Sequence, residues 1–172
     1  MSFLKRNWKL VLVVWIVGLA VWGIPRLRDQ WQLEHRQMDL LRGIANRNAR
    51  TYSSLISPTY ADDWKFTSAM IQRAMDDVSA QFLTMKIEPV NPTWKIGDTE
   101  ASCELTLKLT GKPATPVGDL ILSKAEELKT PIKFTWHKEG FGAWTWKLVA
   151  VSVPDLEVPE GYTPGMLSGR EE

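Results

Sequence analysis

The chain contains 172 residues, and its 21 Lys and Arg side chains nearly balance 20 Asp and Glu side chains, for a formal net charge of +1. This balance provides no broad positive field, so it argues against nucleic acid as a partner. A single cysteine, Cys103, excludes an internal disulfide, and its place among alternating apolar residues predicts a small buried side chain rather than a catalytic thiol. The roughly 145 residues beyond position 28 are enough for one domain with a core and too few for two.

An uncharged apolar run occupies residues 10–24, behind a tail that contains Lys5, Arg6 and Lys9. Leu, Ile and Val dominate this run, and each favours insertion into a bilayer by roughly 0.3–0.6 kcal/mol. As a helix the run measures about 22 Å, and flanking basic side chains can reach the headgroups, so it is long enough to span a membrane. We therefore expect residues 1–28 to form a basic tail and a transmembrane anchor.

A cleaved signal peptide is the alternative for this segment, since it also combines a basic tail with an apolar run. Val21-Trp22-Gly23 is a poor cleavage site because it contains Trp and is not an Ala-x-Ala sequence, so a retained anchor is favoured. The flanking charges are nearly even, with Lys5, Arg6 and Lys9 before the run and Arg26, Arg28 and Arg36 after it. We expect a cytoplasmic N-terminus and a domain exported into the cell envelope, with the reverse orientation left open.

Residues 29–51 lack proline, and apolar residues recur there at helical spacing. This spacing predicts a long amphipathic helix, which would serve as a spacer and as a candidate surface for self-association. Arginines on its other face would point to solvent or, close to the membrane, bind anionic headgroups. The apolar stripe consists of Leu33, Met38, Leu40, Leu41 and Ile44.

Two further helix starts follow. Ser57-Pro58 pairs an N-cap residue with a first-turn proline and predicts a short helix through Tyr60 and Trp64. Thr67 begins the next helix, which places Asp76 and Asp77 opposite its apolar stripe. That stripe consists of Met70, Ile71, Ala74, Met75, Val78 and Phe82.

Beyond Phe82 the apolar period changes from 3.6 to 2, which indicates strands. A first strand around residues 85–88 is expected to break at Pro89 and Pro92. The clearest strand covers residues 101–110, where five apolar side chains alternate with polar ones and predict one buried face. A loop over 111–118 and a helix over 119–129 are expected next.

The last two strands form a predicted hairpin, with alternation from Ile132 to His137, a turn at residues 138–142 and a return strand over 143–153. In the return strand we expect Trp144, Trp146 and Leu148 to share one face. The tail over residues 154–172 is rich in Pro and Gly and is expected to be extended or disordered.

This order of elements resembles the nuclear transport factor 2-like superfamily, also called the cystatin-like α+β cone. The resemblance covers residues 30–153 and rests on the stretches 134–140 (Phe-Thr-Trp-His-Lys-Glu-Gly) and 144–149 (Trp-Thr-Trp-Lys-Leu-Val). It implies an α+β domain over residues 29–153, in which about three helices pack on a curved antiparallel sheet and enclose a concave pocket. With the N-terminal transmembrane helix, the chain is also similar to membrane-tethered members of bacterial envelope assemblies.

Catalytic members of this superfamily project a His, Asp or Tyr into the cone. The resemblance therefore makes Tyr52, Tyr60, Asp62, Asp63 and His137 candidates for acid–base chemistry. Each also has a structural alternative, since the carboxylates and the histidine can face solvent and the tyrosines can pack helix against sheet. The two histidines in the sequence are far apart, so we expect no metal site, and nothing indicates a cofactor.

Tryptophans are the other candidates for a pocket or interface. Trp94, Trp136, Trp144 and Trp146 fall on one predicted sheet, and Trp64 is expected beside it. Cross-strand packing is the favoured interpretation, whereas joint exposure of two of them would indicate a protein interface.

Three functions are consistent with these features. The favoured hypothesis is a non-enzymatic, single-pass membrane protein whose exported domain binds another protein or a second copy of itself. A pocket enzyme of dehydratase, isomerase or hydrolase type would instead use Tyr60 with Asp62 or Asp63. A carrier of a small apolar ligand would need an open, apolar cavity.

Overall fold

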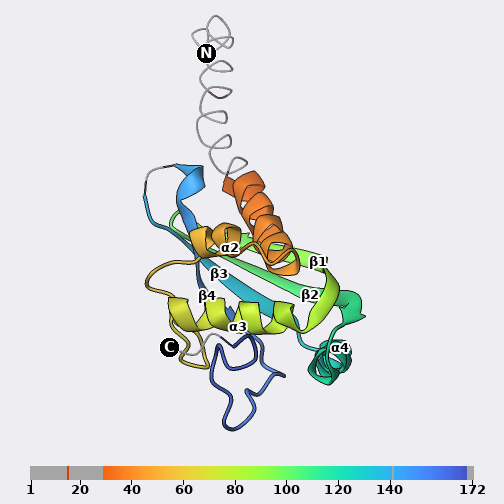
Figure 1. The fold of residues 1–172 in the computed structure, drawn as a ribbon. Coiled ribbons are helices and arrows are strands. Elements are labelled where there is room, and N and C mark those ends of the chain that lie inside the picture. The colour runs from red at the N-terminus through yellow and green to blue at the C-terminus, as the bar shows by residue number, and fades with distance from the viewer. Residues whose placement is uncertain (1–14, 16–28, 141, 170–172) are drawn as a thin grey trace, which may run out of the picture.

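The computed structural model describes residues 15, 29–140 and 142–169 (Figure 1). The predicted anchor at residues 10–24 lies outside these residues, apart from Trp15. Among the described residues, no helix is both long and apolar enough to cross a membrane.

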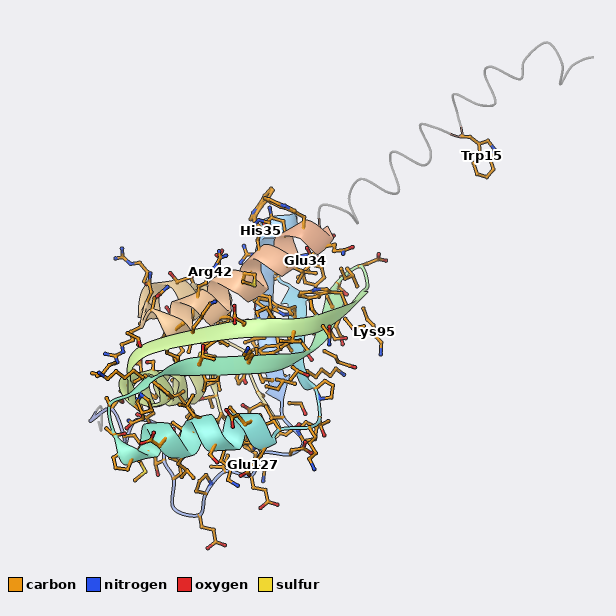
Figure 2. The ribbon with its side chains drawn as sticks, turned by 90° about the vertical axis from the view of Figure 1, so that its right-hand side faces the viewer. Trp15, Glu34, His35, Arg42, Lys95 and Glu127 are labelled. Atoms are coloured by element: carbon orange, nitrogen blue, oxygen red, sulfur yellow. The ribbon has the colours of Figure 1, made fainter. Side chains whose placement is uncertain are left out.

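The domain is α+β, with a four-stranded antiparallel sheet in the order β1-β2-β3-β4. The strands are β1 (Phe82–Ile96), β2 (Glu100–Pro113), β3 (Ile132–Lys138) and β4 (Trp146–Ser152). The helix over residues 29–45 runs alongside β1 (Figure 2). β3 pairs with β2 only as far as Leu105, so the outer halves of β1 and β2 continue as a two-stranded ribbon.

The first helix is shorter than predicted. Helical residues 29–45 are followed by a turn and then by α2 (Ala49–Leu55), so the continuous helix predicted as far as Thr51 is wrong. Arg47 has a φ of 55°, in the left-handed region that ends helices. Asn48 then caps α2, because its side chain accepts a hydrogen bond from the backbone N–H of Thr51 at 3.2 Å.

The predicted short helix through Tyr60 and Trp64 is also wrong, because residues 57–66 form turns. The Asp62 carboxylate accepts hydrogen bonds from the backbone N–H groups of Trp64 at 3.1 Å and Phe66 at 2.9 Å. A side-chain acceptor of this kind offers the backbone an alternative to helical bonds.

The helix predicted to start at Thr67 is confirmed as α3 (Ser68–Ala80), with Thr67 as its N-cap. Ile71 and Met75 are buried, as the apolar stripe predicts. Asp77 differs from the prediction, because its side chain is 0% exposed although the pattern places it on the solvent face.

The C-terminal tail explains the burial of Asp77. Its carboxylate accepts hydrogen bonds from the Tyr162 hydroxyl at 2.9 Å and from the backbone N–H groups of Gly165 at 2.8 Å and Ser168 at 2.7 Å. The expectation of an extended or disordered tail is therefore wrong for residues 162–168, which fold back onto α3.

β1 is longer than predicted and passes through Pro89 and Pro92 without a break. Its ladder to β2 shifts register between Val90 and Thr93. β1 is an edge strand, and proline is tolerated at edges and bulges because some backbone N–H groups there have no ladder partner.

The other predicted strands are confirmed with altered ends. In β2, Ala101, Cys103 and Leu105 are buried on one face. The helix predicted over residues 119–129 is confirmed as α4 (Pro116–Glu127), which starts three residues earlier and ends two residues earlier.

The return strand β4 begins at Trp146, because residues Ala143–Thr145 form a 3-10 helix. Trp144 therefore lies outside the strand and is 61% exposed, so the prediction that it shares a face with Trp146 and Leu148 is wrong.

Candidate functional site

The sheet carries two tryptophans that fill the space under the helices. Trp136 and Trp146 are both 0% exposed. The Trp136 indole N–H donates to the Gln37 side-chain oxygen at 3.2 Å, and the Trp146 indole N–H donates to Asp29 at 3.3 Å. Buried indole groups with polar partners are typical of a specified core.

Asp29 is in turn neutralised by Lys138, whose Nζ lies 2.8 Å from its second carboxylate oxygen and 5.4 Å from the centre of the Trp146 ring. These contacts join the start of the described helix to the ends of β3 and β4. The concave side of the sheet, where the superfamily resemblance implies a pocket, is thus occupied here by packed side chains. The fully buried large side chains are Trp136, Trp146, Tyr52, Phe82, Leu33, Leu40, Leu41, Leu105 and Leu148.

Tyr60 and Asp62 are the two predicted catalytic candidates that the fold brings together. The Tyr60 hydroxyl donates to the Asp62 carboxylate at 2.9 Å, and burial, followed by the charge of Asp62, raises the pKa of Tyr60 well above its usual value. The other Asp62 oxygen already accepts two backbone N–H groups of the 62–66 turn. This arrangement keeps the phenol protonated and assigns the carboxylate to holding a loop.

The remaining candidates are separated from that pair. Asp63 is exposed and accepts a hydrogen bond from the Ser152 hydroxyl at 2.6 Å. His137 is exposed on β3, 3.3 Å from Glu100. Tyr52 is buried, and its hydroxyl donates to Asp76. The structure therefore does not assemble the predicted acid–base residues into one site.

The candidate tryptophans divide in the same way. Trp64 is half-buried, with its indole N–H donating to the Leu156 carbonyl at 3.2 Å. Trp94 is half-buried and faces Cys103 across the β1–β2 ladder. With Trp136 and Trp146 in the core, Trp144 is the one member of the predicted sheet cluster that is exposed. Core packing, the favoured interpretation, holds for Trp136 and Trp146.

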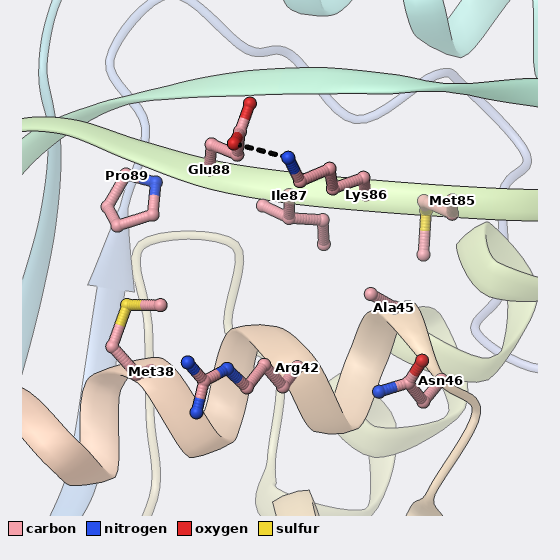
Figure 3. A pocket seen from close by; sticks show the side chains of 9 residues that line it. All are labelled: Met38, Arg42, Ala45, Asn46, Met85, Lys86, Ile87, Glu88 and Pro89. Atoms are coloured by element: carbon pink, nitrogen blue, oxygen red, sulfur yellow. Dashed lines mark ion pairs between the residues drawn. The ribbon is translucent and has the colours of Figure 1, made fainter.

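An open groove of about 510 Å³ lies elsewhere, between the helix over 29–45 and β1 (Figure 3). Apolar side chains of β1 and of the second half of the helix point toward one another across it, whereas Glu88 points away from the helix and pairs with Lys86 (Figure 3). Most of its lining is apolar, and its volume lies within the range of about 300–1,000 Å³ typical of ligand sites. The lining residues are Met38, Arg42, Ala45, Asn46, Met85, Lys86, Ile87, Glu88 and Pro89.

The charges of the groove are unevenly compensated. Lys86 lies 2.6 Å from Glu88, so these two side chains neutralise each other. Arg42 is exposed and forms no ion pair with a carboxylate of the described residues. The groove therefore combines a mostly apolar lining with the Arg42 guanidinium, whose positive charge is not paired with a carboxylate of the described residues.

Sequence reasoning missed this groove. The predicted break at Pro89 removed half of the strand that forms one wall, and Met38 counted only as part of a core-facing stripe. The one available signal is the Met85–Ile87–Pro89 alternation beside an edge, because apolar residues on an edge strand need a covering element.

No family model matches this chain, and no curated protein matches it. Solved structures do match. A putative scytalone dehydratase from Novosphingobium aromaticivorans aligns with a TM-score of 0.55 at 11% identity over 87% of this chain and 99% of that one. A Nostoc punctiforme protein of unknown function with a cystatin-like fold aligns with a TM-score of 0.52 at 12% identity over 74% and 95%.

Bdellovibrio bacteriovorus Bd1075 aligns with a TM-score of 0.53 at 8% identity over 70% of this chain, but over only 38% of its own length. Structures described as NTF2-like are also matched. The described domain thus has the α+β fold of the cystatin-like and nuclear transport factor 2-like proteins. At these identities the likeness concerns the fold alone, which hosts unrelated functions.

Proposed function

We propose that this protein is a non-enzymatic, membrane-tethered binding domain of the cell envelope, which takes a segment of a partner protein into the groove between the helix over 29–45 and β1. The observation that carries the proposal is the contrast between two spaces. The concave side of the sheet is filled by Trp136 and Trp146, whereas the groove beside β1 is open and mostly apolar.

The groove chemistry favours a protein segment with an acidic side chain. Met38 and Met85 face the groove, and methionine adapts to varied apolar surfaces because its thioether chain is flexible. Arg42 supplies a guanidinium suited to bidentate pairing with a carboxylate. β1 is also an edge strand, which can pair with an added strand.

The tether is the apolar run at residues 10–24, with the N-terminus in the cytoplasm. The basic tail before the run and its many aliphatic residues support this assignment. Because the described domain begins only a few residues after the run, binding would take place close to the membrane.

Site-specific photocrosslinking in intact cells tests the binding site. A photoreactive amino acid at Met38 should yield a covalent adduct with one protein, whereas the same group at Leu120, which is 58% exposed on α4, should not. Arg42→Glu should reduce the adduct because it repels an acidic side chain, and Arg50→Glu on α2 is the matched control. A lipid adduct at Met38 would favour the carrier hypothesis, and an adduct with a second copy would identify self-association.

Cysteine labelling tests the orientation. In a Cys103→Ser background, Glu160→Cys introduces one thiol on an exposed part of the tail. A membrane-impermeant maleimide should label it in intact cells if the domain is exported. Labelling only after lysis would place the domain in the cytoplasm.

A pocket enzyme is the second candidate, favoured by the Tyr60–Asp62 contact and by the fold shared with a putative dehydratase. If the protein is an enzyme that uses this pair, Tyr60→Phe should abolish the turnover measured with a set of dehydratase-type substrates, while the melting temperature should change little. In a structural role, Asp62→Asn would mainly destabilise the 62–66 turn.

A further inference from the structure

We infer that the end of the domain that carries Trp31 and Trp144 rests in the lipid–water interface of the membrane. The inference rests on the proposed tether and adds a second contact to it, made by the folded domain itself. The surface around Trp31 and Trp144 would contact the headgroup layer of the bilayer.

The two tryptophans are exposed at one end of the molecule. Trp31 is 54% exposed and Trp144 is 61% exposed, although they are 113 residues apart in the sequence. The Arg36 guanidinium, five residues after Trp31 on the same helix, donates to the Trp144 carbonyl and so joins the two segments.

The other tryptophans of the described domain behave differently. Trp64 and Trp94 are half-buried, and Trp136 and Trp146 are fully buried. Exposed indoles are thus confined to the end of the domain next to the predicted anchor. Tryptophan is enriched at membrane interfaces because its ring is apolar while its N–H stays hydrated.

Both exposed rings are held in place by local structure. The Trp31 ring lies 3.9 Å from the His35 ring, measured between centroids, and the His35 Nδ1 lies 2.8 Å from the Trp31 carbonyl oxygen. Gly142 has a φ of +110°, and a Cβ at this position would lie 2.8 Å from the Trp144 ring. Glycine at this turn therefore gives the Trp144 indole the space to pack across the backbone.

Chain length limits how far this end of the domain can lie from the proposed membrane anchor. Four residues separate the apolar run at 10–24 from Asp29. At most about 3.6 Å per residue, this segment keeps Asp29 within roughly 18 Å of the hydrocarbon edge. Asp29 is bonded to Lys138 and Trp146, so the ends of β3 and β4 are held at the same distance. The headgroup layer is about 5–8 Å thick, so the contact requires the connecting segment to span less than about half of its greatest length.

The charges at this end allow the contact. Asp29 is neutralised by Lys138, and the Glu34 side chain accepts a hydrogen bond from Gln30 at 2.9 Å. Arg26 and Arg28 lie in the connecting segment, where basic residues gain about 1 kcal/mol each near an anionic surface. The indoles supply the part of the contact that does not depend on lipid charge.

Fluorescence quenching by brominated lipids tests the inference on the full chain in phosphatidylcholine vesicles. A double variant, Trp31→Phe with Trp144→Phe, should lose part of the lipid-quenched tryptophan emission, because the quencher acts only at short range. Bromines near the headgroup should reveal a larger loss than bromines near the bilayer centre. Trp94→Phe is the matched control, and it should lower total emission without lowering the quenched part.

The outcomes separate this contact from the tether. If the chain resists carbonate extraction but the double variant keeps the full quenched emission, the tether stands and the interfacial contact is refuted. If carbonate releases the chain from the vesicles, the tether fails and the contact fails with it. If a second copy covers the two rings, they stay unquenched in vesicles, and this result also overturns the inference.

Discussion

Asp77→Asn is the sharpest test of how the domain holds its C-terminal tail. The substitution keeps the size of the side chain but removes its charge and one of its two acceptor oxygens. In the native protein one carboxylate oxygen accepts from Tyr162 and Gly165, and the other accepts from Ser168. An amide at this position must turn an N–H group toward at least one of these donors.

The size of the effect follows from these three bonds. An unpaired buried donor costs about 1–3 kcal/mol, and a hydrogen bond to a charged acceptor contributes about 1.5–3 kcal/mol. Some of the loss is recovered where the amide oxygen keeps its donors. We therefore expect the free energy that docks residues 162–168 on α3 to fall by about 2–4 kcal/mol.

Hydrogen–deuterium exchange measures this loss where it occurs. The backbone amides of Gly165 and Ser168 should exchange roughly 30- to 700-fold faster in the variant, at about tenfold per 1.4 kcal/mol. Glu126→Gln, on the exposed face of α4, serves as the control and should leave both amides unchanged. If Gly165 and Ser168 remain as protected in Asp77→Asn as in the native protein, the carboxylate does not hold the tail and the reasoning is wrong.

Three further predictions concern acid, the cysteine and a close approach of two strands. Burial, the largest influence, raises the pKa of Asp77, but the donors from Ser168, Gly165 and Tyr162 outweigh it and hold this pKa below its usual value. The tail should therefore stay docked on α3 at pH values above about 3.9, the pKa of an Asp in the unfolded chain. As the pH falls through the lower pKa of Asp77 in the folded protein, the tail amides should lose their protection, and hydrogen–deuterium exchange at acid pH measures this loss. Burial, with Glu34 and Glu104 nearby, raises the pKa of Cys103 to about 12, so a thiol reagent should react only at the rate of unfolding. Gly111→Ala places a Cβ 2.2 Å from the Thr84 carbonyl oxygen and should lower the free energy of unfolding by about 1–3 kcal/mol in a denaturant titration, whereas a change below the error of the titration would contradict this close approach.

The spacing of apolar residues predicted those helices and strands that bury one face along their whole length. The stripe after Thr67 corresponds to α3, and the alternation in 101–110 and 132–137 corresponds to β2 and β3. The hairpin sequences also indicated the α+β fold class. These predictions succeeded because a helix or strand with one buried face repeats its apolar residues at a fixed period.

The candidate site depended on contacts that no local pattern contains. Tyr60 and Asp62 were expected on a helix, and the structure places them in a turn where the carboxylate binds backbone N–H groups. Trp144 was expected in a strand and lies on a short 3-10 helix, exposed beside the first helix.

The sequence by itself determined the α+β order of elements and the buried face of the strand that contains Cys103, and it predicts a membrane anchor at residues 10–24. Apolar content and apolar period are properties of a single segment, so they can be recognised in the sequence without knowing which other segments that one contacts. Tertiary structure decided that Asp77 is buried, that β1 passes through its prolines and that a groove opens beside Arg42. Each of these depends on a partner element distant in the chain, and the free energy of such a contact exists only once the two elements meet.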